Sequence, residues 1–561
     1  METCGECCKI GIQASVSAKV AVAGETSADG YPVDTGLMEG AILSPFLYTV
    51  FIDGLIRAFH KSGVGCKVGG MWAGALYYAD DLCLIADSPE DMQKMLRVLD
   101  TYCRDWQFRP AYEKTKVLYF GHTEHSPLYL PCMYDMPERD GGEGSNTGEI
   151  MVATEYVYLG VKVTTSRTHT AHVASVRPKV QAARARLRKY YVGASGLAPR
   201  YNARLMRSLV EPNLRYCAAS WAPISRGEGL PRCGPVAEKV AREVVGAYNI
   251  AARRAIGANI LATGAAVYGT LGIPSPDTVW ASATLGYVDR AARLPDGRLP
   301  KVVLEAALTG ARLEKGTTNN PVIPGTLKYN TGNSLVDRIV AAHVHLMGVA
   351  PTAADILKPK SFKTPAKETR KMNGAGRADA EWDEYVEKSA ANGAALYVIC
   401  PPPSQNTYVQ KRRYGQFPES RFRLLIQMRT YSHCLRNHSG KRDGIPLNER
   451  VCLQCDTGEV ESESHHIWRC EPGEPARKKL LETLGGIYPN VEEELSAMSC
   501  DERRTLMLLW TLPDGGYDGK VASAMKSDGA ARVAATWAIL NYLHATHVQH
   551  PGLKKYYQPW A

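Results

Sequence analysis

The sequence predicts a multi-domain α+β protein: antiparallel strands with packed helices come first, then a helical region, then a small cysteine-bearing module. Three observations predict this fold class. A hairpin pattern with an adjoining helix pattern occupies residues 74–106, an Ala-rich helical pattern covers residues 235–350, and closely spaced cysteines begin at Cys452. With 561 residues, and about 150 per domain, the chain has room for three or four folding units.

The composition is that of a folded protein with an excess of positive charge. Apolar residues make up 45% and charged residues 22% of the chain, close to globular averages. Lys and Arg number 67 against 57 Asp and Glu, which favours polyanionic partners where the excess is clustered. Because the sequence has neither a run of about 18 uncharged apolar residues nor a leader pattern, we expect no membrane insertion and no secretion. The 15 scattered cysteines indicate a reducing compartment, where a cysteine cluster is better interpreted as a metal site.

The first elements alternate between helix and hairpin patterns. Residues 41–55 form an apolar helix candidate, and residues 74–86 are typical of two short strands joined at an acidic tip. Ser88 is a predicted N-cap, because Pro follows it and an acid lies three residues on. The helix that it starts has an apolar stripe made of Met92, Met95, Leu96, Leu99, Cys103 and Trp106. Residues 155–163 are typical of a strand or hairpin arm, and a first unit closes near residue 165.

The middle of the chain is predicted to be basic and helical. Residues 177–215 contain ten Lys or Arg against one acid, on a helical pattern that breaks at residues 193–199. Residues 358–371 hold six basic residues and two prolines, which is typical of an exposed linker. We therefore expect parts at 1–165, 166–230, 231–355, 356–379 and 380–561.

The acidic tip of the first hairpin is Asp80-Asp81. Adjacent carboxylates repel each other unless a cation lies between them. Nucleotidyl transfer uses such carboxylates to hold two Mg²⁺ ions about 3.5 to 4 Å apart. Taken alone, the dipeptide also fits an ordinary solvated turn, because Asp is common in turns.

The residues around this tip resemble the motifs of reverse transcriptases, in the family's order. The motifs are Gly36 to Pro45, Tyr78-Ala79-Asp80-Asp81, Glu113 to Gly121, and Tyr158-Leu159-Gly160-Val161. The chain looks most like the reverse transcriptase of non-LTR (LINE-type) retrotransposons, across residues 10–290 and again 420–475. This resemblance implies part of a polymerase palm in residues 1–165, thumb-like basic helices in 166–230 and a helical connector in 231–355.

The resemblance also implies an RNA-directed DNA polymerase that uses Mg²⁺ or Mn²⁺, an RNA template, a DNA primer or target, and dNTPs. The enzyme would act in the nucleus or cytoplasm, with the nucleus as the family's expectation. Lys114 would lie near the triphosphate, although a solvated surface lysine is an equal alternative. The other implied site residues are Asp80 and Asp81 as metal ligands, Tyr78 and Gly40 beside nucleotide or template, and Leu159 and Gly160 in the primer grip.

Two features depart from the family pattern. The family's earlier catalytic Asp, on an apolar palm strand, has no counterpart between Met1 and Gly36, so we expect the chain to begin partway through the polymerase domain. Glu39 stands where relatives usually carry Gln, and its negative charge is unfavourable beside a triphosphate. We therefore expect little or no polymerase activity from this chain alone. The alternatives are a non-catalytic nucleic-acid-binding remnant that uses the basic helices and a zinc knuckle, or a relic that folds poorly.

The C-terminal part contains a predicted metal site. Cys452, Cys455, His465 and Cys470 follow the spacing C-x2-C-x9-H-x4-C, which can close a tetrahedral Zn²⁺ site. His466 competes with His465, and similarity to the zinc-knuckle-like segment after LINE-type polymerases favours His465. Buried thiols without a metal are the alternative interpretation. With all four positions filled, the zinc would be structural and support nucleic-acid contact. The sequence supports neither an RNase H nor an endonuclease carboxylate set.

Overall fold

The computed structural model divides into two compact units, one of Met1–Arg167 with Leu294–Ala306 and the other of Thr168–Arg293 with Ala307–Ala561. The structure describes residues 16–18, 21–22, 25–26, 31–33, 42–121, 126–133, 148–191, 199–225, 232, 236–256, 258, 262, 264–310, 334–347, 350–357, 421, 424–425, 427–428, 435, 440, 443–511 and 529–550. In this described part, no helix is both long and apolar enough to span a membrane.

The strands of the N-terminal unit are short and pair two by two. The antiparallel pairs are β1 (Val16–Ala18) with β4 (Tyr31–Val33), β2 (Ala21–Val22) with β3 (Glu25–Thr26), β5 (Lys67–Val68) with β6 (Met71–Trp72), β7 (Ala75–Tyr78) with β8 (Asp81–Leu84), and β11 (Glu155–Tyr158) with β12 (Val161–Thr164). A parallel pair joins β9 (Lys116–Val117) to β10 (Met151–Val152).

Apart from the parallel pair, these pairs agree with the antiparallel strands that we expected for this unit, and the sheets are narrow. Within the described ranges every sheet has two strands. The physical reason is length, because strands of two to four residues offer few free N–H and C=O groups for a third strand. A bond outside the strands connects two of the pairs: the Cys66 N–H, just before β5, donates to Ile85 O, just after β8, at 3.0 Å.

Two helices cover the strands of the N-terminal unit. Helix α2 (Ser44–Ser62) has Pro in its first turn and ends at Gly63, whose φ of 70° is easy for glycine. Helix α3 (Pro89–Trp106) begins as predicted, since the Ser88 hydroxyl accepts a hydrogen bond of 3.1 Å from the Asp91 N–H. The predicted N-cap is therefore confirmed. The remaining short helices of this unit are 3₁₀ turns at Tyr112–Lys114 (η1) and Pro131–Met133 (η2).

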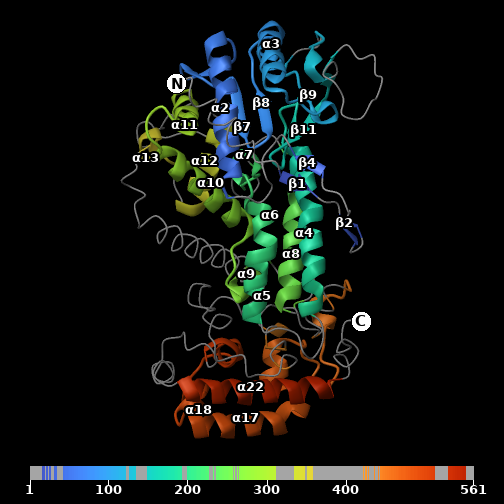
Figure 1. Ribbon diagram of the computed structural model, residues 1–561. Helices are drawn as coiled ribbons and strands as arrows, with labels where there is room; N and C mark the ends of the chain where they lie inside the picture. The colour runs from blue at the N-terminus through green and yellow to red at the C-terminus, as the bar shows by residue number, and fades with distance from the viewer. Residues whose placement is uncertain are drawn as a thin grey trace, which may run out of the picture. The chain divides into compact units, whose positions relative to one another are not determined.

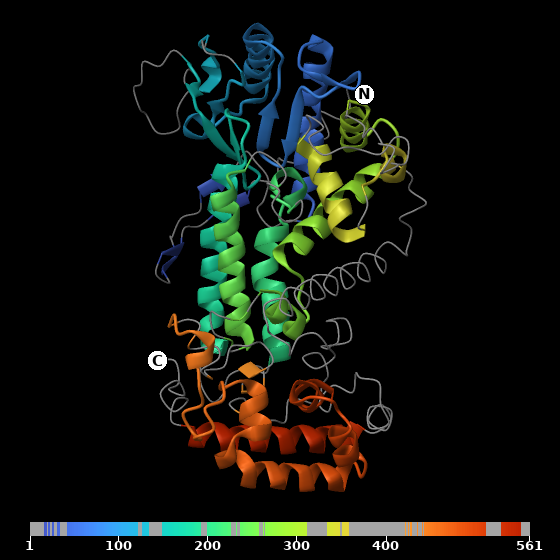
Figure 2. The same ribbon diagram turned by 180° about the vertical axis from the view of Figure 1, so that it is seen from behind.

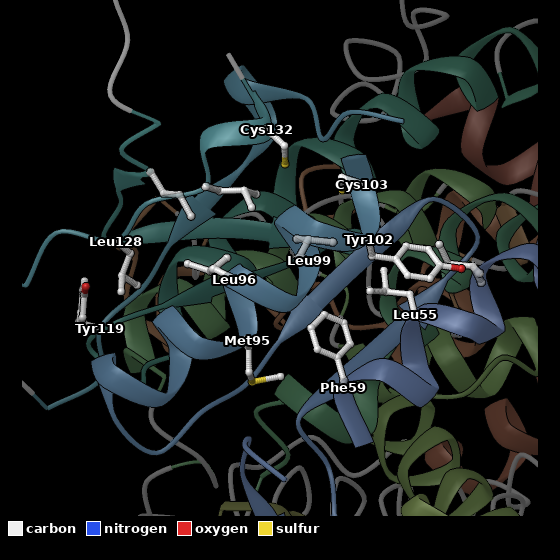
Figure 3. Packing of buried hydrophobic residues seen from close by; sticks show 13 residues of the cluster. Leu55, Phe59, Met95, Leu96, Leu99, Tyr102, Cys103, Tyr119, Leu128 and Cys132 are labelled. Carbon is white, nitrogen blue, oxygen red and sulfur yellow. The ribbon is translucent and has the colours of Figure 1, made fainter. Parts of the chain in front are cut away.

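The core of this unit lies between α2, α3 and the hairpins (Figure 3). Helix α2 contributes Leu55 and Phe59, and loop residues around Leu128 and Cys132 close the far side. The predicted stripe on α3 is confirmed at Met95, Leu96, Leu99 and Cys103, whereas Met92 is half-buried and Trp106 is 37% exposed.

A close crossing joins α2 to α3. The Tyr102 hydroxyl donates to Phe51 O at 2.9 Å, and a Cβ on Gly54 would lie 2.6 Å from the same hydroxyl oxygen. Only glycine at residue 54 allows this approach without displacing the tyrosine.

The second unit contains mostly helices in its described residues. They are α4 (Thr170–Tyr191), α5 (Pro199–Leu205), the π-helix η3 (Met206–Val210), α6 (Glu211–Arg215), α7 (Ala218–Trp221), α8 (Glu238–Ile256), α9 (Gly264–Leu271), α10 (Pro276–Ala292), α12 (Ser334–Met347) and α13 (Ala353–Leu357). Helix α11 (Leu299–Thr309) starts in the first unit. The predicted helical pattern over residues 177–215 is confirmed where it is described, while the break at residues 193–199 lies mostly outside the described residues.

Helices α4 and α8 lie side by side in both views (Figures 1 and 2). Helix α8 buries small residues such as Ala241, Ala251 and Ala252. Arg177 on α4 forms an ion pair of 2.8 Å with Glu243 on α8. The basic residues of α4 are therefore not all free to meet a polyanion.

The C-terminal part of the second unit is built on helices that run alongside each other (Figure 1). Its elements are the 3₁₀ turns at Leu447–Glu449 (η6) and Glu471–Gly473 (η8), the π-helices His465–Arg469 (η7) and Met507–Thr511 (η9), and the helices α17 (Glu474–Ile487), α18 (Val491–Ser496), α19 (Asp501–Leu506) and α22 (Gly529–Gln549). Buried Leu480, Leu484 and Leu543 come from α17 and α22 and form part of the apolar core there. Most of the predicted linker, from residue 358 on, lies outside the described residues.

Candidate functional site

The acidic hairpin forms as the sequence predicts. Strands β7 and β8 pair with Tyr78 opposite Asp81 and Tyr77 opposite Leu82, which leaves Ala79 and Asp80 as a two-residue turn. Asp80 therefore lies in the turn and Asp81 opens the returning strand. Both acids lie at the exposed end of the hairpin.

The alternation of side chains explains why this end is exposed. Tyr77 and Leu82 point to the core, where they pack against the buried cluster. Tyr78 and Asp81, one residue away on each strand, must then point to the opposite face. Tyr78 is 66% exposed, an unusual state for so large an aromatic side chain. The hairpin thus presents an aromatic ring and two acids on one rigid support.

Backbone strain is concentrated at the turn. Ala79 has φ 53°, a left-handed conformation that costs a non-glycine residue roughly 1–2 kcal/mol. The second hairpin has a different turn, because Leu159 (φ 46°) is followed by Gly160 (φ 77°) between Tyr158 and Val161. Positive φ at both central residues is the type I′ arrangement, which suits the twist of a hairpin.

The two hairpins influence each other electrostatically within this unit. The pKa of Tyr158 is raised by burial and, to a smaller extent, by the Cys83 thiol and the Asp81 carboxylate. The pKa of Tyr48 on α2 is raised by burial and then by Asp80. The hydroxyl of Tyr158, which belongs to the fourth sequence motif, and that of Tyr48, which the sequence interpretation missed, therefore lie near the carboxylate pair. No spacing rule could have identified Tyr48, since it comes from a distant element.

The other residues implied by the resemblance are not all brought together. Lys114 is exposed on η1, and in the described part of the chain the structure records no ion pair between it and either carboxylate. Leu159 and Gly160 form the turn of the second hairpin. Gly40 and Glu39 lie outside the described residues.

The carboxylate pair is an incomplete ligand set. Carboxylate oxygens suit Mg²⁺, which takes hard oxygen ligands. Among the described residues, however, no third Asp, Glu, His or Cys joins Asp80 and Asp81 in a compact group of ligand atoms. The two carboxylates are therefore of the right donor type for Mg²⁺, but they are too few to form a complete site.

A second candidate site lies in the C-terminal module. Ligand atoms of Cys452, Cys455, His465 and Cys470 all lie within 4.8 Å of one another. Cys452 Sγ is 3.9 Å from Cys470 Sγ, and Cys455 Sγ is 3.3 Å from His465 Nε2. The structure thus brings all four predicted ligands together. Three of these residues are buried and Cys455 is half-buried.

Local backbone structure makes this arrangement. The Cys452 N–H donates to Glu459 O at 2.9 Å, and Val451 bridges Val460, so residues 451–460 turn back on themselves. The chain then enters η7, where the Cys470 N–H donates to His465 O at 2.8 Å. The wide π-turn places His465 and Cys470 on the same side, facing the first two thiols.

The thiols differ in their electrostatic setting. Burial raises the pKa of Cys452 well above the ordinary thiol value, and burial raises that of Cys470 to about 11. The pKa of Cys455 is lowered, since hydrogen bonds from Thr457 and the neighbouring thiols outweigh its burial. The more exposed Cys455 is therefore the thiol best prepared to lose its proton.

His465, and not His466, belongs to this group. The His466 ring is buried against two other imidazoles, with centroids 5.3 Å from His547 and 5.8 Å from His550. Nearby Glu461 is fully buried, with Oε1 2.5 Å from His550 Nε2 and 3.5 Å from Cys452 Sγ. The sequence interpretation missed Glu461 and His550, because 89 residues separate them.

Three thiols and one imidazole are the donor set that Zn²⁺ prefers in closed structural sites. The residues present fit this metal in type, number and proximity, and the fit leaves no open position for a reacting water. The C-terminal site is therefore suited to holding structure rather than to catalysis.

The chain was compared with known proteins and protein families. No curated protein matches the chain. Residues 5–163 match the family model of the reverse transcriptase (RNA-dependent DNA polymerase), and this stretch includes the Asp80-Asp81 tip and the Leu159-Gly160 turn. Over these residues the N-terminal part of the chain is thus similar to the reverse transcriptase family.

Proposed function

We propose that this chain is the polymerase part of a non-LTR (LINE-type) reverse transcriptase, in which Asp80 and Asp81 bind divalent metal. The observation that carries the proposal is the exposed carboxylate pair beside Tyr78, fixed on a hairpin whose opposite face is in the core. The order of the four sequence motifs supports the non-LTR type. Its partners would be an RNA template, a DNA primer or target and dNTPs, and a nuclear site of action follows from the same type.

Each residue has a role that its position allows. Asp80 and Asp81 would hold Mg²⁺ or Mn²⁺, which activates a primer 3′-hydroxyl and stabilises the departing pyrophosphate. The exposed Tyr78 ring offers an apolar face to a nucleotide or primer end. The Leu159-Gly160 turn would contact the primer backbone, and Lys114 would supply positive charge to the triphosphate.

We expect the chain alone to extend a primer weakly or not at all. Two carboxylates hold a pair of metal ions poorly, because each ion needs several oxygen ligands. The described residues add no third acid to Asp80 and Asp81. Metal binding is therefore a better test of the site than turnover.

Iron-directed cleavage is the experiment that tests this site. Fe²⁺ replaces Mg²⁺ in oxygen-ligand sites, and with ascorbate and peroxide it cuts the backbone nearby. We expect fragments that end near residue 80 in the wild type, and their loss in the double variant Asp80→Asn, Asp81→Asn. Asp87→Asn, which removes an exposed acid after the same hairpin, should leave the fragments unchanged. Equal fragmentation in all three proteins would contradict the proposal.

Primer extension on an RNA template provides the second measurement. Strong Mg²⁺-dependent extension that the double variant loses would support the polymerase assignment but overturn the expectation of low activity. It would also mean that a further carboxylate completes the site.

A second candidate function is nucleic-acid binding without catalysis, with a zinc-stabilised C-terminal module. The compact group of three cysteines and His465 favours it, together with the basic residues of α4. On this interpretation RNA affinity falls steeply with salt, and Asp80→Asn leaves affinity unchanged. Zinc should be present at about one ion per chain. Fluorescence anisotropy at several salt concentrations and metal analysis measure both properties.

A further inference from the structure

The two ring nitrogens of His465 have different partners. Nε2 faces the thiols, 3.3 Å from Cys455 Sγ, whereas Nδ1 lies 2.9 Å from Glu459 Oε2 on the opposite side. A carboxylate that accepts a hydrogen bond from Nδ1–H keeps the proton on that nitrogen. The lone pair of Nε2 is then directed at the position where the metal would be bound.

Glu459 is itself held in place. Arg469 Nη1 lies 3.1 Å from the same Oε2 atom, and Arg469 Nε lies 3.1 Å from Asp501 Oδ2. Asp501 in turn pairs with Arg504 at 3.0 Å. The carboxylate is therefore oriented by a chain of ion pairs that reaches α19.

The backbone of Glu459 contacts a second ligand. Its carbonyl oxygen accepts the N–H of Cys452 at 2.9 Å, while its carboxylate contacts His465. One residue thus connects the first and third ligands of the C-x2-C-x9-H-x4-C set.

We propose that Glu459 is a positioning residue for metal capture, which fixes His465 in the tautomer and orientation that present Nε2 to the ion. The inference rests on the proposed zinc site and adds a residue outside the ligand spacing. Carboxylate partners of metal-binding histidines orient the ring and strengthen it as a ligand.

Glu461 is the other acid close to the ligands, and its position excludes the same role. Its carboxylate lies 3.5 Å from Cys452 Sγ and is engaged by His550 at 2.5 Å. It contacts a thiol instead of the imidazole, and a carboxylate beside a thiolate repels it. Of these two acids, Glu459 is the one placed to act on His465.

The test compares zinc affinity in the full-length chain and three variants. We expect Glu459→Ala to weaken Zn²⁺ binding by about 10- to 100-fold in competition with a chromophoric chelator. Glu459→Gln keeps an acceptor oxygen for Nδ1–H, so it should recover part of this loss. The control is Glu471→Ala, which removes an exposed acid next to Cys470 and should bind like the wild type.

Cobalt spectra separate a positioning effect from loss of the site. At saturating Co²⁺, the Glu459→Ala chain should still show the thiolate charge-transfer and tetrahedral bands of the wild type, because its four ligands remain. Wild-type affinity in Glu459→Ala, or no recovery in Glu459→Gln, would overturn the positioning role. Failure of the wild type to bind either metal would overturn the zinc site itself, an outcome that is visible before any variant is made.

Discussion

The two candidate metal sites of this protein contrast in donor type, number of donors and burial. Asp80 and Asp81 offer two hard oxygen donors on an exposed hairpin tip. The C-terminal group offers four donors, three of them sulfur, within 4.8 Å of one another and mostly buried. A site with four ligands, three of them sulfur, can be assembled by its own local fold. A site with two carboxylates needs further oxygen ligands to hold a metal ion.

The contrast extends to the surroundings of each site. Around the cysteines, ion pairs and buried acids form a second layer that includes Glu459, Arg469 and Glu461. Near the acid pair lie the hydroxyls of Tyr48 and Tyr158, whose pKa values are raised by burial and then by neighbours that include Asp80 for Tyr48 and Asp81 for Tyr158. We expect the first environment to hold a metal ion more tightly than the second. Four predictions test this difference, from the largest expected effect to the smallest.

Replacing a thiol should destroy the C-terminal site. Cys452→Ser leaves two thiols and one imidazole for a metal whose binding stabilises the fold, so we expect zinc loss and destabilisation on the order of 5 kcal/mol. Metal analysis and thermal unfolding measure both effects. Cys500→Ser changes a thiol outside the group and serves as the control. Full zinc content in Cys452→Ser would contradict the assignment of Cys452 as a zinc ligand.

The buried pair Glu461–His550 should be the next most costly to break. Both side chains are almost fully buried, at 0% and 1% exposure, so His550→Ala removes the imidazole that pairs with a buried acid. Removing one member of a buried pair costs about 3–5 kcal/mol. Denaturant unfolding would measure this, with the more exposed His544→Ala for comparison. A cost below about 1 kcal/mol would show that Glu461 is stabilised in another way.

Zinc binding should release protons from the C-terminal site. The raised pKa values of Cys452 and Cys470 mean that both thiols are protonated at pH 7 in the metal-free protein, and they must ionise to bind zinc. Affinity should therefore rise with pH, on the order of 100-fold per unit for two protons, until the pKa of Cys470 near 11 is approached. Calorimetry in two buffers with different ionisation enthalpies counts the protons. Release of none would mean that the thiols are already ionised.

The smallest effect should come from the turn of the acidic hairpin. Ala79→Gly relieves the positive φ of 53° and should stabilise the N-terminal unit by about 1 kcal/mol. Gly160→Ala in the other hairpin introduces the same strain and should destabilise by a similar amount. Paired unfolding curves measure the two changes. Equal and opposite shifts would show that the strain at Ala79 is local to its turn.

Much of the local structure could be predicted from the sequence. Ser88 caps α3 as expected, the acidic hairpin forms with Asp80 in its turn, and the spacing of Cys452, Cys455, His465 and Cys470 brings these residues together. Each of these features depends on residues within a few positions of one another or on one short loop. Local hydrogen bonds and turn geometry decide such features.

Only the tertiary structure decided what surrounds the two sites. The influence of Asp81 on Tyr158, the pairing of Glu461 with His550 and the support of Glu459 by Arg469 involve side chains that no spacing rule connects. The width of the sheets was likewise decided by the tertiary structure, since strands of two to four residues pair only in twos within the described ranges. The candidate ligands could be identified from the sequence, because residue type and short spacing are local properties. The residues that orient the ligands or pair with acids beside them come from more distant segments, and packing alone brings these segments together.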